Sequence, residues 1–259
     1  MWPMLVTLLV TGIAGPPPQA GGQWPTLAAE LRDHNVPVPN GVNADGHITS
    51  FSTFDDERWF AIGYYDVAAD GLLHDLRVRV FDKNSRAWRS ATFAGIGSVL
   101  SIRRHGGVFF VEGHSSPSSG PLLVLSDDLR LKRDLEGWIV FTLADGRVIF
   151  SRGMRHFMPT QAQVLAVYVP ATNRDADIYP ARSDNDRGGE HVAGTDVWMD
   201  RTIGDVKAGK DGRTIEFTVT EQHMRIDANQ RPIPAAAQVT RHVICDISRG
   251  LPACTPARD

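Results

Sequence analysis

Short apolar runs alternate with short polar segments from residue 47 almost to the C-terminus. The runs are rich in Val, Ile, Phe, Tyr and Thr, and many alternate apolar with polar side chains. This length and period predict β-strands. Before them, residues 27–32 predict one short helix with Thr26 as its N-cap, which Pro37 and Pro39 end.

The predicted strands fall into four units of four, spaced about 40–50 residues apart. In chain order the units comprise 48–54, 59–65, 76–81 and 88–93; 98–103, 108–112, 122–125 and 129–135; 138–143, 147–151, 164–169 and 175–179; and 203–207, 214–220, 239–245 with a short strand near Cys254.

Tight polar turns occupy matching places in the units. First and second strands are joined by 55–57, 105–107, 145–146 and 211–212, and third and fourth strands by 82–85, 126–128, 172–174 and 248–250. Several of these turns contain the Gly that a hairpin turn with positive φ requires.

The period and the turns resemble the blades of a β-propeller across residues 47–255. We therefore expect an all-β, propeller-like array of about four four-stranded blades, closed into a ring, as a single domain over 47–259. No Trp-Asp repeat marks the blades and four is an uncommon number, so a β-sandwich is the alternative. The segments 97–102, 122–126, 137–138 and 156–160 also resemble a group of uncharacterised exported bacterial proteins, which implies export and a similar fold but no activity.

The N-terminus predicts export. Residues 4–14 form an apolar run of signal-peptide length, too short to span a bilayer, and small residues follow at Ala14, Gly15 and Ala20. We expect a signal peptide over 1–20 and an extension over 21–46 that holds the short helix. No Lys or Arg precedes Arg32, which departs from the usual basic start. The predicted location is periplasmic or extracellular.

The two cysteines fit that location. Cys245 and Cys254 flank a segment with Gly and Pro, and a turn there could bring the two thiols together. In an oxidising compartment we expect a disulfide; the alternative is two free thiols.

Composition limits the partners. Hydrophobic residues make up 42% and charged residues 22% of the 259 residues, as in ordinary soluble domains. A formal net charge of -3 predicts no attraction to nucleic acid.

Histidines suggest where a ligand would bind. Each predicted connection from a second to a third strand carries one, and these are His74, His114, His156 and His223. Loops at the same place in successive blades share one rim, so imidazoles there could hold a ligand or a metal ion. Four scattered surface histidines are the alternative.

The long connection over 181–204 is expected on the same rim. It carries Asp184, Asp186, Glu190 and His191, and the oxygen ligands resemble part of a calcium loop. Thr195 stands where a calcium loop needs a bidentate Glu, so a solvated loop is favoured and no cofactor is expected. Trp198 in this connection could stack on a sugar.

No motif specifies a reaction, so the function is inferred from the rim. We expect an exported, non-catalytic protein that binds a small molecule, glycan or protein there. The alternative is a polysaccharide hydrolase or lyase that uses rim carboxylates such as Asp66, Glu112, Asp184 and Glu190. An enzyme should show a close acidic pair with shifted pKa in a cleft, and a binding module should not. A purely structural surface protein should show no pocket.

Overall fold

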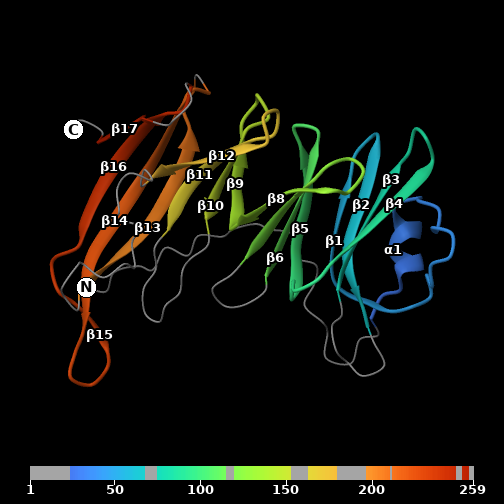
Figure 1. The fold of residues 1–259 in the computed structure, drawn as a ribbon, viewed down its shortest axis with the longest axis horizontal. Helices are drawn as coiled ribbons and strands as arrows, with labels where there is room; N and C mark the ends of the chain where they lie inside the picture. Colours follow the sequence, from blue (N-terminus) through green and yellow to red (C-terminus); the bar gives the residue numbers. More distant parts are fainter. Residues whose placement is uncertain are drawn as a thin grey trace.

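The computed structural model describes residues 24–67, 75–114, 120–152, 163–179, 197–210, 212–248 and 253–256. These residues form one short helix and seventeen strands in four antiparallel sheets (Figure 1). The all-β prediction is therefore confirmed, and a sandwich of two sheets is excluded.

The strands of each sheet follow one another in chain order. The elements of the first two sheets are α1 (Leu27–Asp33), which precedes sheet 1, then β1 (Ile48–Asp55), β2 (Trp59–Asp66), β3 (Leu76–Asp82) and β4 (Ala87–Phe93) in sheet 1, and β5 (Ser98–His105), β6 (Val108–His114), β7 (Pro121–Leu125) and β8 (Leu131–Glu136) in sheet 2.

Sheets 3 and 4 complete the array. Their strands are β9 (Trp138–Thr142), β10 (Val148–Arg152), β11 (Val164–Val169) and β12 (Arg174–Tyr179) in sheet 3, and β13 (Val197–Ala208), β14 (Thr214–Ile226), β16 (Val239–Asp246) and β17 (Ala253–Pro256) in sheet 4. The short strand β15 (Pro232–Pro234), which the sequence patterns did not predict, pairs with the end of β14.

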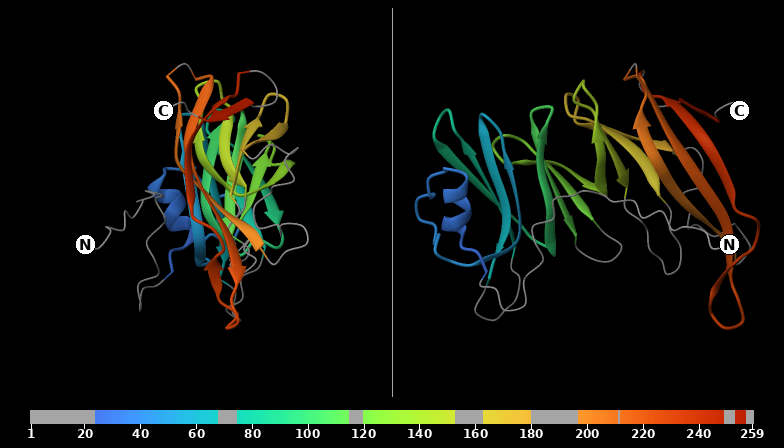
Figure 2. Two further views of the ribbon diagram at one scale, coloured as in Figure 1. Left: turned by 90° about the vertical axis from the view of Figure 1, so that its left-hand side faces the viewer. Right: turned by 180° about the vertical axis from the view of Figure 1, so that it is seen from behind.

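The four sheets stack face to face in an open row, with sheets 1 and 4 at opposite ends (Figures 1 and 2). The expectation of a closed ring is therefore wrong for the described residues. Burial explains the difference. In β2 and β6 consecutive residues are buried, so both faces of sheets 1 and 2 are covered, whereas burial in β14 alternates and only one face is covered.

The outer face of sheet 4 is polar, which suits the end of a row. Thr218, Thr220, Thr240 and His242 lie on this face, and the hydroxyls of Thr220 and Thr240 lie 3.4 Å apart. At the other end of the row, α1 covers the outer face of sheet 1.

Helix α1 begins where the sequence predicts. The Thr26 hydroxyl accepts a hydrogen bond of 3.2 Å from the backbone N–H of Ala29, as an N-cap should. Leu27 and Leu31 are buried from this helix, in one cluster with Phe60 and Ile62 of β2.

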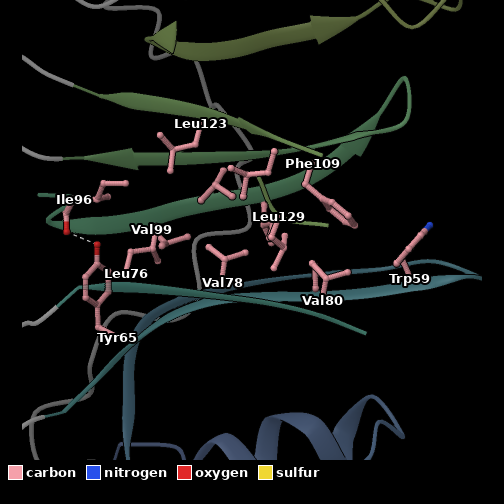
Figure 3. Close-up of a cluster of buried hydrophobic side chains, with 14 residues drawn as sticks. Trp59, Tyr65, Leu76, Val78, Val80, Ile96, Val99, Phe109, Leu123 and Leu129 are labelled. Carbon is pink, nitrogen blue, oxygen red and sulfur yellow. Dashed lines mark hydrogen bonds between the residues drawn. The ribbon is translucent and has the colours of Figure 1, made fainter. Parts of the chain in front are cut away.

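Three further apolar cores lie between successive sheets. The core between sheets 1 and 2 joins Trp59, Val78 and Val80 from sheet 1 to Phe109 and Leu123 from sheet 2 (Figure 3).

The row has two long sides, which we call the hairpin rim and the connection rim. The hairpin rim (upper side in Figure 1) carries the turns between first and second strands and between third and fourth strands. The connection rim (lower side) is where second strands end, at Asp66, His114, Arg152 and Ile226.

Cys245 and Cys254 form a disulfide, as predicted. They pair directly across β16 and β17, with Cα atoms 4.0 Å apart. Within the described ranges, no helix has the length and hydropathy needed to cross a membrane.

Candidate binding site

Three of the predicted site residues lie in the described part of the chain, and all three belong to strands. His114 is the last residue of β6 and its side chain is exposed. His223 lies within β14, opposite Met199 of β13, and is half-buried. Trp198 lies in β13, opposite Met224.

The prediction that His223 and Trp198 lie in loops is therefore wrong. Strands β13 and β14 pair from Val197 and Arg225 onward, so this hairpin is longer than the apolar pattern alone indicates. The other six predicted residues lie outside the described residues, and they are His74, His156, Asp184, Asp186, Glu190 and His191.

His114 and His223 lie in sheets 2 and 4, with sheet 3 between them in the row. Among the described residues, no three His, Cys, Asp or Glu side chains are grouped so that they could hold a metal ion. The predicted ring of histidines depends on His74 and His156, and it stays a prediction.

The connection rim does carry a cleft, between sheets 1 and 2 beside His114. Its volume is about 380 Å³, within the usual range for small-ligand sites. It is lined by Thr92, Phe93, Ala94, Gly95, Ile96, Pro121, Leu123, Leu131, Asp134 and Glu136. The backbone places His114 next to it, because the His114 carbonyl accepts a hydrogen bond from Gly97, which directly follows Ile96.

Glycine at position 113 is what allows this close approach. A Cβ atom there would lie 2.6 Å from a methyl carbon of Ile96 and 3.1 Å from Pro121, and both of these residues line the cleft. The wall formed by Ile96 is fixed from the other side, where the buried Tyr65 hydroxyl donates to the Ile96 carbonyl (Figure 3).

Strand β8 supplies the acidic wall. Side chains alternate along a strand, so Arg133 and Leu135 face sheet 3, where Leu135 is part of the core. Asp134 and Glu136 then face sheet 1, opposite Leu123 and Pro121 of β7.

These two carboxylates have no salt bridge or hydrogen-bond partner among the described residues. Both side chains are exposed at the mouth of the cleft. Partial burial and, second, the negative charge of Glu136 raise the pKa of Asp134 above its ordinary 3.8. The arrangement favours a positively charged group between the carboxylates and the apolar floor.

The facing wall has no ionisable side chain. It consists of Thr92, Phe93, Ala94, Gly95 and Ile96. Cleavage of a glycosidic bond needs two carboxyl groups that flank it, whereas Asp134 and Glu136 reach in from a single strand. The pair meets the general description of an acidic pair in a cleft, but its geometry favours binding a cation over hydrolysis.

Two of the rim carboxylates named for the hydrolase alternative, Glu112 and Asp66, lie in the described residues, and both have partners. Glu112 is buried and accepts hydrogen bonds from the backbone N–H of Ile139 at 2.6 Å and from the Ser101 hydroxyl at 2.5 Å. Asp66 pairs with Arg77. Glu112 is therefore held inside the scaffold, whereas Asp66 stays half-exposed in a surface ion pair.

Near His223 lies a second buried charge cluster, between sheets 3 and 4. Glu221 accepts from Arg201 at 2.9 Å and from Arg241 at 2.5 Å, and Arg201 is only 1% exposed. The Tyr179 hydroxyl also reaches Glu221, at 3.4 Å. Both carboxylate oxygens are thus taken by guanidinium groups, which makes this cluster part of the scaffold under His223.

Another hollow, of about 350 Å³, lies on the hairpin rim between sheets 3 and 4. Arg147 crosses it and donates to the backbone carbonyls of Ile247 and Gly212 while pairing with Asp145. The guanidinium therefore joins the two sheets, and the hollow offers fewer unpaired groups than the cleft beside His114.

Neither a protein-family model nor a curated protein matches the chain. Among solved structures, the chain is similar to MPT-4, a mannose phosphorylase from Leishmania mexicana in complex with a phosphate ion. The match has a TM-score of 0.32 and 12% sequence identity, and it covers 89% of this chain and 76% of that one. A likeness this distant carries no argument about what this chain binds or does.

Proposed function

We propose that this chain is an exported, non-catalytic binding protein, and that its ligand places a positively charged group in the cleft beside His114. The observation that carries the proposal is that two carboxylates without a salt-bridge partner, those of Asp134 and Glu136, lie on one wall above an apolar floor. A cation with an apolar body would offset the repulsion between the carboxylates and bury apolar surface.

Three further observations support the proposal. Of the described carboxylates that the hydrolase alternative would use, Glu112 is held in the scaffold and Asp66 is paired with Arg77. The Cys245–Cys254 disulfide suits an oxidising compartment, as does the apolar leader over residues 4–14. His114 lies beside the cleft and belongs to the rim on which His74, His156 and the segment 184–191 are expected to contribute.

Calorimetric titration with benzylammonium tests the charge and the apolar body together. We expect saturable binding to the intact protein, and at least about tenfold weaker binding when Asp134→Asn and Glu136→Gln are combined, because charge-assisted contacts each contribute about 1.5–3 kcal/mol. Glu57→Gln, which removes one exposed carboxylate from the hairpin rim, is the control and should bind like the unmodified protein.

Two comparisons can contradict the proposal. Benzyl alcohol, the neutral analogue, should bind much more weakly, and equal binding would show that charge is irrelevant. The free energy of unfolding of the double variant should stay unchanged or rise slightly, since like charges are removed. A large loss of stability would make these residues structural.

The affinity for benzylammonium should depend on pH in a definite direction. Protonation removes the charge that attracts the cation, so affinity should fall as the pH falls through the pKa of Asp134. Because that pKa is raised above 3.8, the loss should begin at a higher pH than an ordinary Asp would give. Titrations at a series of pH values would show this.

A further inference from the structure

On the hairpin rim, at the opposite end of the interface between sheets 1 and 2, three arginines surround one tryptophan. The guanidinium carbons of Arg58, Arg104 and Arg89 lie 4.7, 5.3 and 5.6 Å from the centre of the Trp59 ring. They come from the turn before β2, from β5 and from β4. Like charges gather in this way only where something offsets their repulsion.

The indole of Trp59 offsets part of the repulsion between the guanidinium groups through its π face. Carboxylates offset another part: Asp127 accepts from Arg104 at 3.1 Å, and Asp82 lies 3.5 Å from Arg58. Arg89 donates to the backbone carbonyl of Asp127, which carries no net charge. A third carboxylate, that of Asp56, accepts from the backbone N–H groups of Arg58 and Trp59 and pairs with none of the three guanidinium groups.

Two hydrogen-bond donors in this cluster have no partner among the described residues, the indole Nε1 of Trp59 and the Nε of Arg104. Both atoms are buried, and Trp59 as a whole is 1% exposed. Figure 3 shows the Trp59 nitrogen at the end of the apolar cluster, directed away from the other labelled side chains. A buried N–H without a partner costs about 1–3 kcal/mol, and such groups commonly mark a place for an ion or a water molecule.

We propose that the Trp59 cluster is a binding site for a small oxyanion such as sulfate. Guanidinium groups match the geometry of oxyanions and bind them through paired N–H donors. An oxyanion here would accept from the two unpaired donors and would place negative charge beside the guanidinium groups. This site lies on the other rim from the cation cleft and does not depend on it.

Arg58 is the most exposed of the three arginines. Its side chain is 54% exposed and its ion pair with Asp82 is long, at 3.5 Å, so moving it costs little. The guanidinium that covers the indole can therefore turn toward an arriving anion. Arg104 is only 21% exposed and is held by Asp127, so it forms the fixed part of the site.

Sulfate titration followed by NMR of the indole N–H groups tests the site. The chain has six tryptophans, and the resonance of Trp59 is the one that Trp59→Phe removes. We expect that resonance alone to shift saturably as sodium sulfate replaces sodium chloride at constant ionic strength. Acetate, which has only two oxygens, should shift it with lower affinity.

Arg58→Gln should weaken sulfate binding about tenfold or more, because a charge-assisted contact is lost, while the exposed position leaves folding intact. Arg130→Gln is the matched control, since Arg130 is on the same rim, pairs with Asp128 and is 85% exposed. It should leave the affinity unchanged.

Three results would overturn the proposal. The first is a Trp59 resonance that does not respond to sulfate. The second is an equal loss of affinity in Arg58→Gln and Arg130→Gln, which would indicate general attraction to a basic surface. The third is an equal response to sulfate and chloride, which would leave only ionic screening. If Trp59→Phe fails to fold, the resonance is identified instead by its change in Arg58→Gln.

Discussion

At the scale of single residues, charged side chains inside this protein join one sheet to the next. Glu112 is the clearest case, because it lies in β6 of sheet 2 and accepts from the backbone N–H of Ile139, the second residue of β9 in sheet 3. The acceptor is one of the two carboxylate oxygens of Glu112, Oε1. The side chain therefore stabilises the contact between two sheets.

Glu112→Ala should lower the free energy of unfolding by about 1–3 kcal/mol, the usual cost of a buried N–H left unpaired. Arg103, which lies 3.8 Å from the same carboxylate and is 40% exposed, provides the control. Arg103→Gln should cost less than about 1 kcal/mol. Urea denaturation of both variants measures the difference, and equal effects would show that the ion pair dominates.

The sequence shows where Glu112 is but not its role. It interrupts the apolar run of β6, and a charged residue in such a run can be either a buried bridge or a group at the rim. Only the position of Ile139 in the next sheet decides between them. Asp134 and Glu136 were missed for a related reason. Their alternation with Leu135 was visible, but the face of β8 that meets sheet 1 was not.

At the scale of elements, α1 closes one end of the row. Its buried residues Leu27 and Leu31 pack in the cluster on the outer face of sheet 1. Without them, Phe60 and Ile62 of β2 would meet water. The helix has only seven residues, too few to be stable alone, so packing rather than helix propensity holds it in place.

Leu31→Ala should therefore destabilise the whole protein by about 2–5 kcal/mol, as is usual for a large side chain removed from a core. Arg32→Ala is the neighbouring control, since Arg32 is exposed in the last turn of α1, and it should change stability by less than about 0.5 kcal/mol. Thermal and urea unfolding give both values. A small effect of Leu31→Ala would mean that sheet 1 is stable without its helix.

The strands of the first three sheets could be predicted from the sequence because their apolar runs are bounded by turn residues. The fourth sheet was predicted less well. Strands β13 and β14 extend to Val197 and Ile226, and polar residues occupy many of their positions. An apolar run is a poor guide to such a hairpin, whose length depends on backbone pairing with the strand beside it.

At the scale of the whole molecule, three of the four tyrosines are buried and the fourth, Tyr179, is half-buried. Burial raises the pKa of Tyr65 to about 12, and it also raises the pKa values of Tyr64, Tyr168 and Tyr179. The folded protein thus holds these phenolic protons more tightly than an unfolded chain, in which the pKa is 10.0.

These phenols should therefore add no pH dependence to stability well below pH 10, and stability should fall as the pH rises toward 12, where the unfolded chain has lost protons that the folded protein retains. Phenolate absorbance and circular dichroism, recorded together against pH, test this. We expect phenolate to form only as the protein unfolds. A tyrosine that ionises near pH 10 while the fold persists would contradict it.

The number of sheets followed from the sequence, but their closure did not. Four similar units suggested a ring because period and turn placement are the same in a ring and in a row. The distinction lies in β14, where Ile215, Phe217 and Val219 alternate with polar residues, while β2 is apolar along its length. A central strand buried on one face only belongs to a layer with a neighbour on one side.

The open row has a consequence for how the number of sheets in such a protein can change during evolution. In a ring, the number of blades fixes the angle between neighbours, so adding one requires every interface to adjust. In this row, each layer needs to match only the layer on either side of it. If one sheet between the capping helix and the polar outer face of sheet 4 were duplicated, the new sheet would need two compatible interfaces and no change elsewhere. Sheets can therefore be gained or lost one at a time.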